Sequence, residues 1–137
     1  MVVPGNPRAK GHKRKEGDEF IAYPDAGVIC GQVEYYRDDP FTIANPVALF
    51  EVLSPSTQIY DHHTKAEQYK KIPGLAYYVM IDSEQVRVEY RKRVDQATWI
   101  EFAPLEDAGD TLSLSLTQEI MLSLAALYEG VDFGDEE

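Results

Sequence analysis

The sequence predicts a single α/β domain from three observations. A short apolar run at residues 47–53 lies between turn formers, as is typical of a strand buried on both faces. A helical pattern at 61–71 follows it, and a second apolar run occupies 76–81. Because strands joined through a helix favour parallel pairing by a right-handed crossover, the two runs should be neighbours in one sheet. Alternating segments beyond residue 85 predict an antiparallel section towards the C-terminus.

Length and composition limit the class of protein. The chain has 137 residues, 44% hydrophobic and 11% aromatic, which is enough for one folded core. No apolar run approaches the roughly 18 residues of a membrane span, and no signal peptide is apparent, so we expect a cytoplasmic protein. The single cysteine, Cys30, excludes an internal disulfide and a thiolate metal cluster, and is interpreted as a small core residue.

Charge and composition divide the chain into three parts. Residues 1–18 are rich in Gly, Pro and basic residues and predict a basic flexible arm, residues 19–131 form one domain, and residues 132–137 form an acidic tail. The net charge of −11 argues against nucleic acid as a partner, but its distribution is uneven. Each basic block is either solvated surface or a contact to a phosphate backbone. The blocks are Arg8, Lys10, Lys13, Arg14 and Lys15, and Arg87, Arg91, Lys92 and Arg93.

The first half of the domain contains the predicted sheet centre. Residues 19–23 and 26–30 are strand candidates, and 32–44 reads as a loop in which 33–36 could extend the sheet. Asp61 is a good N-cap for the following helix. Residues 66, 69 and 72 mark the apolar stripe of this helix, and Pro73 with Gly74 ends it.

The second half predicts short antiparallel elements. The alternating pattern at 85–90 is typical of a half-exposed strand, with 97–102 as the other arm of a hairpin. Residues 111–116 and 120–122 are further strand candidates. Ser123 should cap a short helix over 124–128, closed by Gly130.

Glu51 interrupts the apolar run at 47–53. An ionised carboxylate in such a run costs several kcal/mol unless a positive charge pairs with it, so the sequence needs a cation beside Glu51. Asp25 begins the preceding strand, and if the two strands are neighbours both carboxylates can converge on Mg²⁺. Lys65, four residues after Asp61 on the predicted helix, is a second candidate cation.

Each of these residues also has a purely structural interpretation. Glu51 could be satisfied by a buried Arg or by a Tyr hydroxyl. Asp25, which follows Pro24, could be a turn residue, and Lys65 could be an exposed helix residue paired with Asp61. Spacing alone leaves both interpretations open.

Several segments together resemble a known family. They are Pro24-Asp25, the run Glu51-Val-Leu-Ser-Pro-Ser56, Asp61 with Lys65, and Tyr77-Tyr-Val-Met-Ile-Asp82. This pattern resembles the Uma family of restriction endonucleases in the PD-(D/E)xK nuclease superfamily, and the likeness extends from about residue 23 to 131. The resemblance implies a restriction-endonuclease-like mixed β-sheet with a crossover helix and a C-terminal antiparallel section. It also implies a metal-dependent DNA endonuclease that uses Mg²⁺, with Mn²⁺ as an alternative.

The resemblance assigns roles residue by residue. Asp25 and Glu51 match the metal ligands, with the backbone carbonyl of Val52 as a third oxygen. The superfamily pattern has a lysine two positions after the acidic residue, where this chain has Leu53. Lys65 on the following helix matches that lysine function, because its long stem can reach the end of the strand.

One departure concerns the N-terminus. Members of this family begin with helices that pack on the sheet, whereas here the arm at 1–18 precedes the first strand. A sheet without that cover would expose an apolar patch, so we expect a homodimer. The alternatives are a catalytically inactive or truncated relative that acts as a DNA- or protein-binding module, and an acidic protein-interaction module without DNA affinity.

Overall fold

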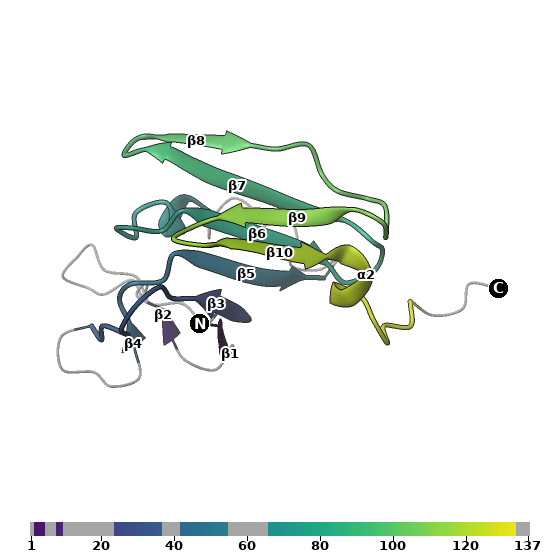
Figure 1. Cartoon of the computed structure of the whole chain (residues 1–137), viewed down its shortest axis with the longest axis horizontal. Coiled ribbons are helices and arrows are strands. Elements are labelled where there is room, and N and C mark those ends of the chain that lie inside the picture. Colours follow the sequence, from purple (N-terminus) through teal and green to yellow (C-terminus); the bar gives the residue numbers. More distant parts are fainter. Residues whose placement is uncertain (1, 5–7, 10–23, 37–41, 55–65, 134–137) are drawn as a thin grey trace.

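The computed structural model describes residues 2–4, 8–9, 24–36, 42–54 and 66–133, and its main element is a six-stranded mixed sheet (Figure 1). β5 and β6 pair in parallel, and the other neighbours in this sheet pair antiparallel. The strands lie in the order β1 (Val2–Pro4), β3 (Ala26–Val28), β5 (Ala48–Leu53), β6 (Tyr77–Asp82), β7 (Val88–Asp95) and β8 (Thr98–Glu101). The predicted mixed α/β sheet is therefore confirmed.

The parallel pair β5 and β6 forms the centre of the sheet, as the two apolar runs predict. Its register runs from Ala48 opposite Tyr77 to Leu53 opposite Asp82. The crossover between the strands contains a helical turn at 66–69, which ends ahead of Gly74, a residue with a φ of 81°. Gly tolerates this left-handed conformation without the steric cost that a Cβ would bring. The predicted N-cap, Asp61, lies outside the described residues.

One face of the central strands packs against the crossover segment. The side chains on this face come from alternate residues of β5 and β6, because successive side chains of a strand point to opposite faces. Tyr69 and Leu75 of the crossover are fully buried against them. This helix-side cluster comprises Leu49, Leu53, Ala66, Tyr69, Ile72, Leu75, Tyr78 and Met80.

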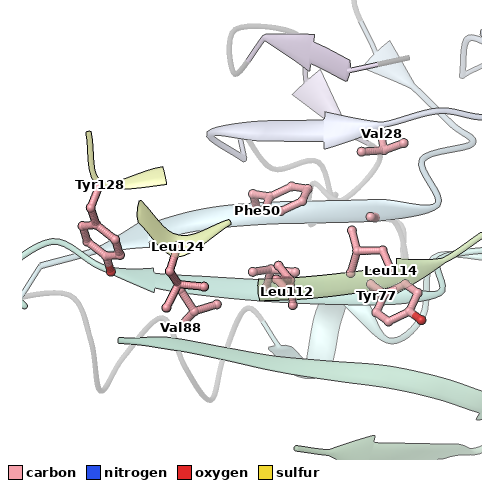
Figure 2. Close-up of a cluster of buried hydrophobic side chains, with 10 residues drawn as sticks. Val28, Phe50, Tyr77, Val88, Leu112, Leu114, Leu124 and Tyr128 are labelled. Carbon is pink, nitrogen blue, oxygen red and sulfur yellow. The ribbon is translucent and has the colours of Figure 1, made fainter. Parts of the chain in front are cut away.

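The opposite face packs against a separate hairpin of β9 (Thr111–Ser115) and β10 (Glu119–Ser123), followed by α2 (Leu124–Leu127). Figure 2 shows the side chains of this hairpin-side cluster between the layers. Leu112, Leu114 and Leu124 are fully buried there. The cluster comprises Val28, Ala48, Phe50, Tyr77, Val79, Val88, Leu112, Leu114, Leu124 and Tyr128. Both predicted C-terminal strands and the short helix are present.

Hydrogen bonds of Ser123 and Tyr128 fix the C-terminal layer. The Ser123 hydroxyl accepts a hydrogen bond from the Ala126 amide at 3.0 Å, which is the predicted N-cap of α2. The Tyr128 hydroxyl donates to the Asp82 carbonyl at 2.7 Å and accepts from the Arg87 amide at 3.2 Å. Tyr128 therefore joins α2 to the turn between β6 and β7.

The N-terminal segment contains five residues with paired backbone. β1 pairs antiparallel with β3, and β2 (Arg8–Ala9) pairs parallel with β4 (Thr42–Ile43). The free N–H and C=O groups of a sheet edge can pair with a strand whatever its composition. The other residues of the arm at 1–18 lie outside the described residues, and the flexible arm stays a prediction. The strand predicted at 19–23 lies outside the described residues, and β4 falls within the predicted loop at 32–44.

The central strands are covered on both faces. Five of the six residues of β5 are buried, and β6 has the same pattern with one half-buried residue. Val52, 49% exposed, is the exception on β5. The exposed apolar face from which we inferred a homodimer is thus not seen on these two strands, and the homodimer stays a prediction. No helix in the described ranges is long and apolar enough to span a membrane.

Candidate active site

The two acidic residues singled out in the sequence lie on or beside neighbouring strands. β3 and β5 pair antiparallel with Ala26 opposite Phe50, and Asp25 directly precedes β3. Asp25 forms hydrogen bonds with the Phe50 carbonyl and the Val52 amide, and these two residues lie on either side of Glu51. Asp25 therefore lies beside the part of β5 that contains Glu51.

The alternation of side chains puts Glu51 on the helix-side face. Phe50 belongs to the hairpin-side cluster. Glu51, the next residue along β5, therefore projects towards the other face. That face is the one covered by the crossover segment, which carries Tyr69.

Asp25 is anchored to the backbone of β5 at the exposed rim of this face. Its amide donates to the Phe50 carbonyl at 3.0 Å, and its Oδ2 accepts from the Val52 amide at 2.7 Å. The N–H and C=O of one strand residue point to the same neighbour, so the Val52 carbonyl is also directed to the Asp25 side of β5. Among the described residues, Oδ1 of Asp25 makes no hydrogen bond, and the side chain is exposed.

Glu51 is buried beneath this rim, with 4% of its surface exposed. Its Oε2 accepts a hydrogen bond from the Tyr69 hydroxyl at 2.6 Å, the length of a charge-assisted bond. Tyr69 is fully buried, and its ring packs edge-to-face on Tyr78 with centroids 5.0 Å apart. The ring contact restricts the direction in which the hydroxyl can point.

The electrostatics of Tyr69 link the two acidic residues. Burial raises the pKa of Tyr69 far above its ordinary value, the Glu51 charge and hydrogen bond raise it further, and Asp25 acts in the same direction. Asp25 and Glu51 thus both lie close enough to the same hydroxyl to influence it. The hydroxyl remains protonated over the physiological range and can act only as a neutral donor to Glu51.

The donor set suits a hard divalent cation. Two carboxylates and a main-chain carbonyl supply the oxygen ligands that Mg²⁺ prefers, and remaining positions would be left for water and substrate phosphate. A Tyr hydroxyl partner is what the structural interpretation of Glu51 allowed. Within the ranges that the structure describes, no group of three or more His, Cys, Asp or Glu could hold a metal. The fit therefore rests on the two carboxylates and the Val52 carbonyl.

A second buried acidic residue among the described ranges organises a turn. Asp82, at the end of β6, accepts hydrogen bonds from the Glu84 amide at 2.7 Å and from the Gln85 side chain at 3.3 Å. These contacts organise the turn into β7. Lys65, the predicted catalytic lysine, lies outside the described residues, so its role stays a prediction.

The second basic block is largely engaged within the protein. Arg87 pairs with Glu89 and Glu106, and Arg91 pairs with Glu101 at 3.5 Å. Arg93 donates to the carbonyls of Lys70, Ile72 and Leu75 at 2.7–3.0 Å and packs over the Trp99 ring at 4.7 Å. Burial lowers the pKa of Arg93. Arg93 therefore joins the crossover segment to β7 through hydrogen bonds, and these bonds occupy the guanidinium that would otherwise contact a phosphate.

Comparison with known proteins identifies the family. Residues 12–126 match the model of the Uma2 family, described as "Putative restriction endonuclease". The chain belongs to this family. The match includes Asp25, Glu51, Val52 and Lys65, and it confirms the resemblance found in the sequence.

Two curated relatives of this Uma2 chain come from Synechocystis. The chain is 33% identical to the uncharacterised protein sll1609 of Synechocystis over 60% of this chain and 46% of that protein. It is 32% identical to the uncharacterised protein slr1290 of the same organism over 80% of this chain and 55% of that protein. The chain thus spans about half the length of the curated relatives it matches.

The structural likeness concerns the fold. A crystal structure of a "putative nuclease" from Anabaena variabilis superposes with a TM-score of 0.62 at 15% identity. The superposition covers 93% of this chain and 67% of that one. At this identity the match shows a shared architecture, in agreement with the mixed sheet expected from the sequence.

Proposed function

We propose that this Uma2 chain is a metal-dependent DNA endonuclease in which Asp25 and Glu51 hold Mg²⁺, or Mn²⁺ in its place. The observation that carries the proposal is the proximity of the two acidic residues: Asp25 Oδ2 accepts a hydrogen bond from the amide of Val52, next to Glu51, and both residues raise the pKa of Tyr69. Family membership supports it independently. The substrate would be DNA. We expect the protein to act in the cytoplasm.

The position of each proposed ligand indicates its role in metal binding. Glu51 is buried and held by a hydrogen bond, so it would supply a metal ligand whose position is fixed. Asp25 lies at the exposed rim, where its carboxylate would face both the cation and the substrate phosphate. The Val52 carbonyl, on the same side, would complete a set of oxygen ligands. The bound cation would supply positive charge and an acidified water for attack on the phosphoryl group.

Lys65 is proposed to assist the hydrolysis. Its ammonium would orient the attacking water or neutralise the charge that develops on the scissile phosphate. Water attacks phosphorus, the bond to the leaving oxygen breaks, and that oxygen takes up a proton. A homodimer would place two such sites on the two strands of a duplex.

Cleavage of supercoiled plasmid tests the proposal. We expect nicking by the wild-type protein with Mg²⁺ or Mn²⁺ and none with a chelator. Asp25→Asn, Glu51→Gln and Lys65→Met should each lower the rate by about 10²-fold or more, the usual loss when one transition-state electrostatic group is removed. Glu119→Gln, which removes one exposed carboxylate on β10, is the matched control and should cut normally. A wild-type protein that cuts with neither metal would contradict the proposal.

A catalytically silent DNA-binding module is the second candidate. It keeps the family fold without cleavage; the paired arginines of the second basic block and the acidic net charge would make its phosphate contacts weak over the described surface. This candidate predicts salt-sensitive DNA affinity without cleavage. Protein that neither cuts nor binds DNA would instead indicate a protein-interaction module.

A further inference from the structure

Tyr69 is a core residue with a polar end that reaches the candidate site. The sequence marks it only as part of the apolar stripe of the crossover helix. In the structure its ring lies wholly within the helix-side cluster, while its hydroxyl donates to Glu51 Oε2 at 2.6 Å. The two residues are 18 positions apart, so this bond joins the crossover segment to β5.

The geometry of this contact is suited to holding a ligand in one orientation. The edge-to-face contact with Tyr78 fixes the ring, and the fixed ring sets the direction of the hydroxyl. A hydrogen bond to one carboxylate oxygen restricts rotation of the Glu51 carboxylate. Because the donor is neutral, it orients this carboxylate without cancelling the charge that a cation needs. Hydrogen bonds of this kind to metal-ligating groups commonly set metal affinity.

We propose that Tyr69 is a positioning residue for the metal site: its hydroxyl holds the Glu51 carboxylate in the orientation that binds the divalent cation. This inference rests on the proposed function, because it assigns a role towards the cation that Asp25 and Glu51 are proposed to share. Tyr69 also places the helix that follows Lys65 in the sequence against the same strand. A purely structural role would stabilise the fold and leave metal affinity unchanged.

Calorimetric titration of the whole chain with Mn²⁺, without DNA, separates these roles. Tyr69→Phe keeps the ring and removes the hydroxyl, and we expect its Mn²⁺ affinity to fall by about 10- to 100-fold. Tyr77→Phe is the matched control, because it removes a hydroxyl that accepts a hydrogen bond from the Ser115 amide at 2.9 Å in the hairpin-side cluster, and it keeps the donor to Glu51. Its affinity should stay within about twofold of wild type. In a Glu51→Gln background, Tyr69→Phe should cause no further loss, since it acts through Glu51.

The outcomes distinguish this inference from the proposed function. Wild-type protein that binds Mn²⁺ and a Tyr69→Phe variant that binds it equally well would overturn the positioning role alone. Wild-type protein that binds no divalent cation would overturn both proposals. If Tyr69→Phe does not fold, the unaltered chain with ¹³C-labelled tyrosine provides the test. Mg²⁺ should then shift the ring Cζ resonance of Tyr69 and not that of Tyr90, a residue of β7 that stacks on Phe102. An unshifted Tyr69 resonance would overturn the role.

Discussion

The two faces of the central sheet are built from the same strands but differ in chemistry. On the hairpin side, Phe50 and Val79 meet the leucines of β9, and the packed surface is apolar. On the helix side, the next residue along β5 is Glu51, a buried carboxylate held by Tyr69. A shift of one residue along a strand thus changes a packing position into a candidate ligand.

This difference indicates a division between stability and function. An apolar face gains free energy from removing side chains from water. A buried carboxylate costs free energy and is retained where it serves a site. We therefore expect substitutions on the hairpin side to affect folding and substitutions on the helix side to affect metal binding and cleavage.

The largest expected effect on stability comes from the hairpin side. Phe50→Ala should lower the free energy of unfolding by about 3–5 kcal/mol, because it removes a buried aromatic ring and leaves a cavity. Phe50→Leu, the milder control, should cost less than about 2 kcal/mol. Denaturant unfolding measures both. Folded Phe50→Ala should bind Mn²⁺ with wild-type affinity, and a loss of affinity matching that of a Glu51 variant would contradict the division between the faces.

A smaller effect is expected from the helix side at alkaline pH. The pKa of Tyr69 is raised in the folded state, so both states are protonated below about pH 10 and this contribution to stability is fully present there. Above that pH the unfolded chain loses the proton first, and stability should fall by up to about 1.4 kcal/mol per pH unit.

Comparison with Tyr69→Phe isolates this contribution. Denaturant unfolding at several pH values between about 9 and 11.5 should give a shallower decline for the variant than for wild type. Tyr90 and Tyr128, whose pKa values are also raised by burial, titrate in both proteins and cancel in the comparison. Equal slopes would show that the pKa of Tyr69 is the same in the folded and unfolded states, which would contradict this prediction.

Much of the fold is predictable from local patterns. The apolar run at 47–53, bounded by turn formers, corresponds to β5, and the strand, helix, strand order gives the parallel pair. The cap at Ser123 is found as predicted, because it depends on residues three positions apart. The boundary of β7 is displaced: the alternation suggests 85–90, whereas the strand is Val88–Asp95.

The remaining features depend on contacts between distant segments. Alternation predicts that 111–116 is a strand, but not that β9 and β10 form a separate hairpin across the sheet. Arg93 belongs to a basic block in the sequence, yet it binds carbonyls of the crossover segment 18 to 23 residues away. Within the site, an acidic residue in an apolar run marks Glu51, whereas no local signal identifies Tyr69 as its donor.

The central claim is that Asp25 and Glu51 share one divalent cation on the helix-side face. Crystals of wild-type protein soaked in Mn²⁺ test it most directly, because anomalous scattering locates the metal without reference to activity. We predict one strong peak between the two carboxylates, within about 2.0–2.4 Å of an oxygen from each, and its loss in Glu51→Gln crystals. The absence of a peak at saturating Mn²⁺, or a peak bound to other residues alone, would contradict the account.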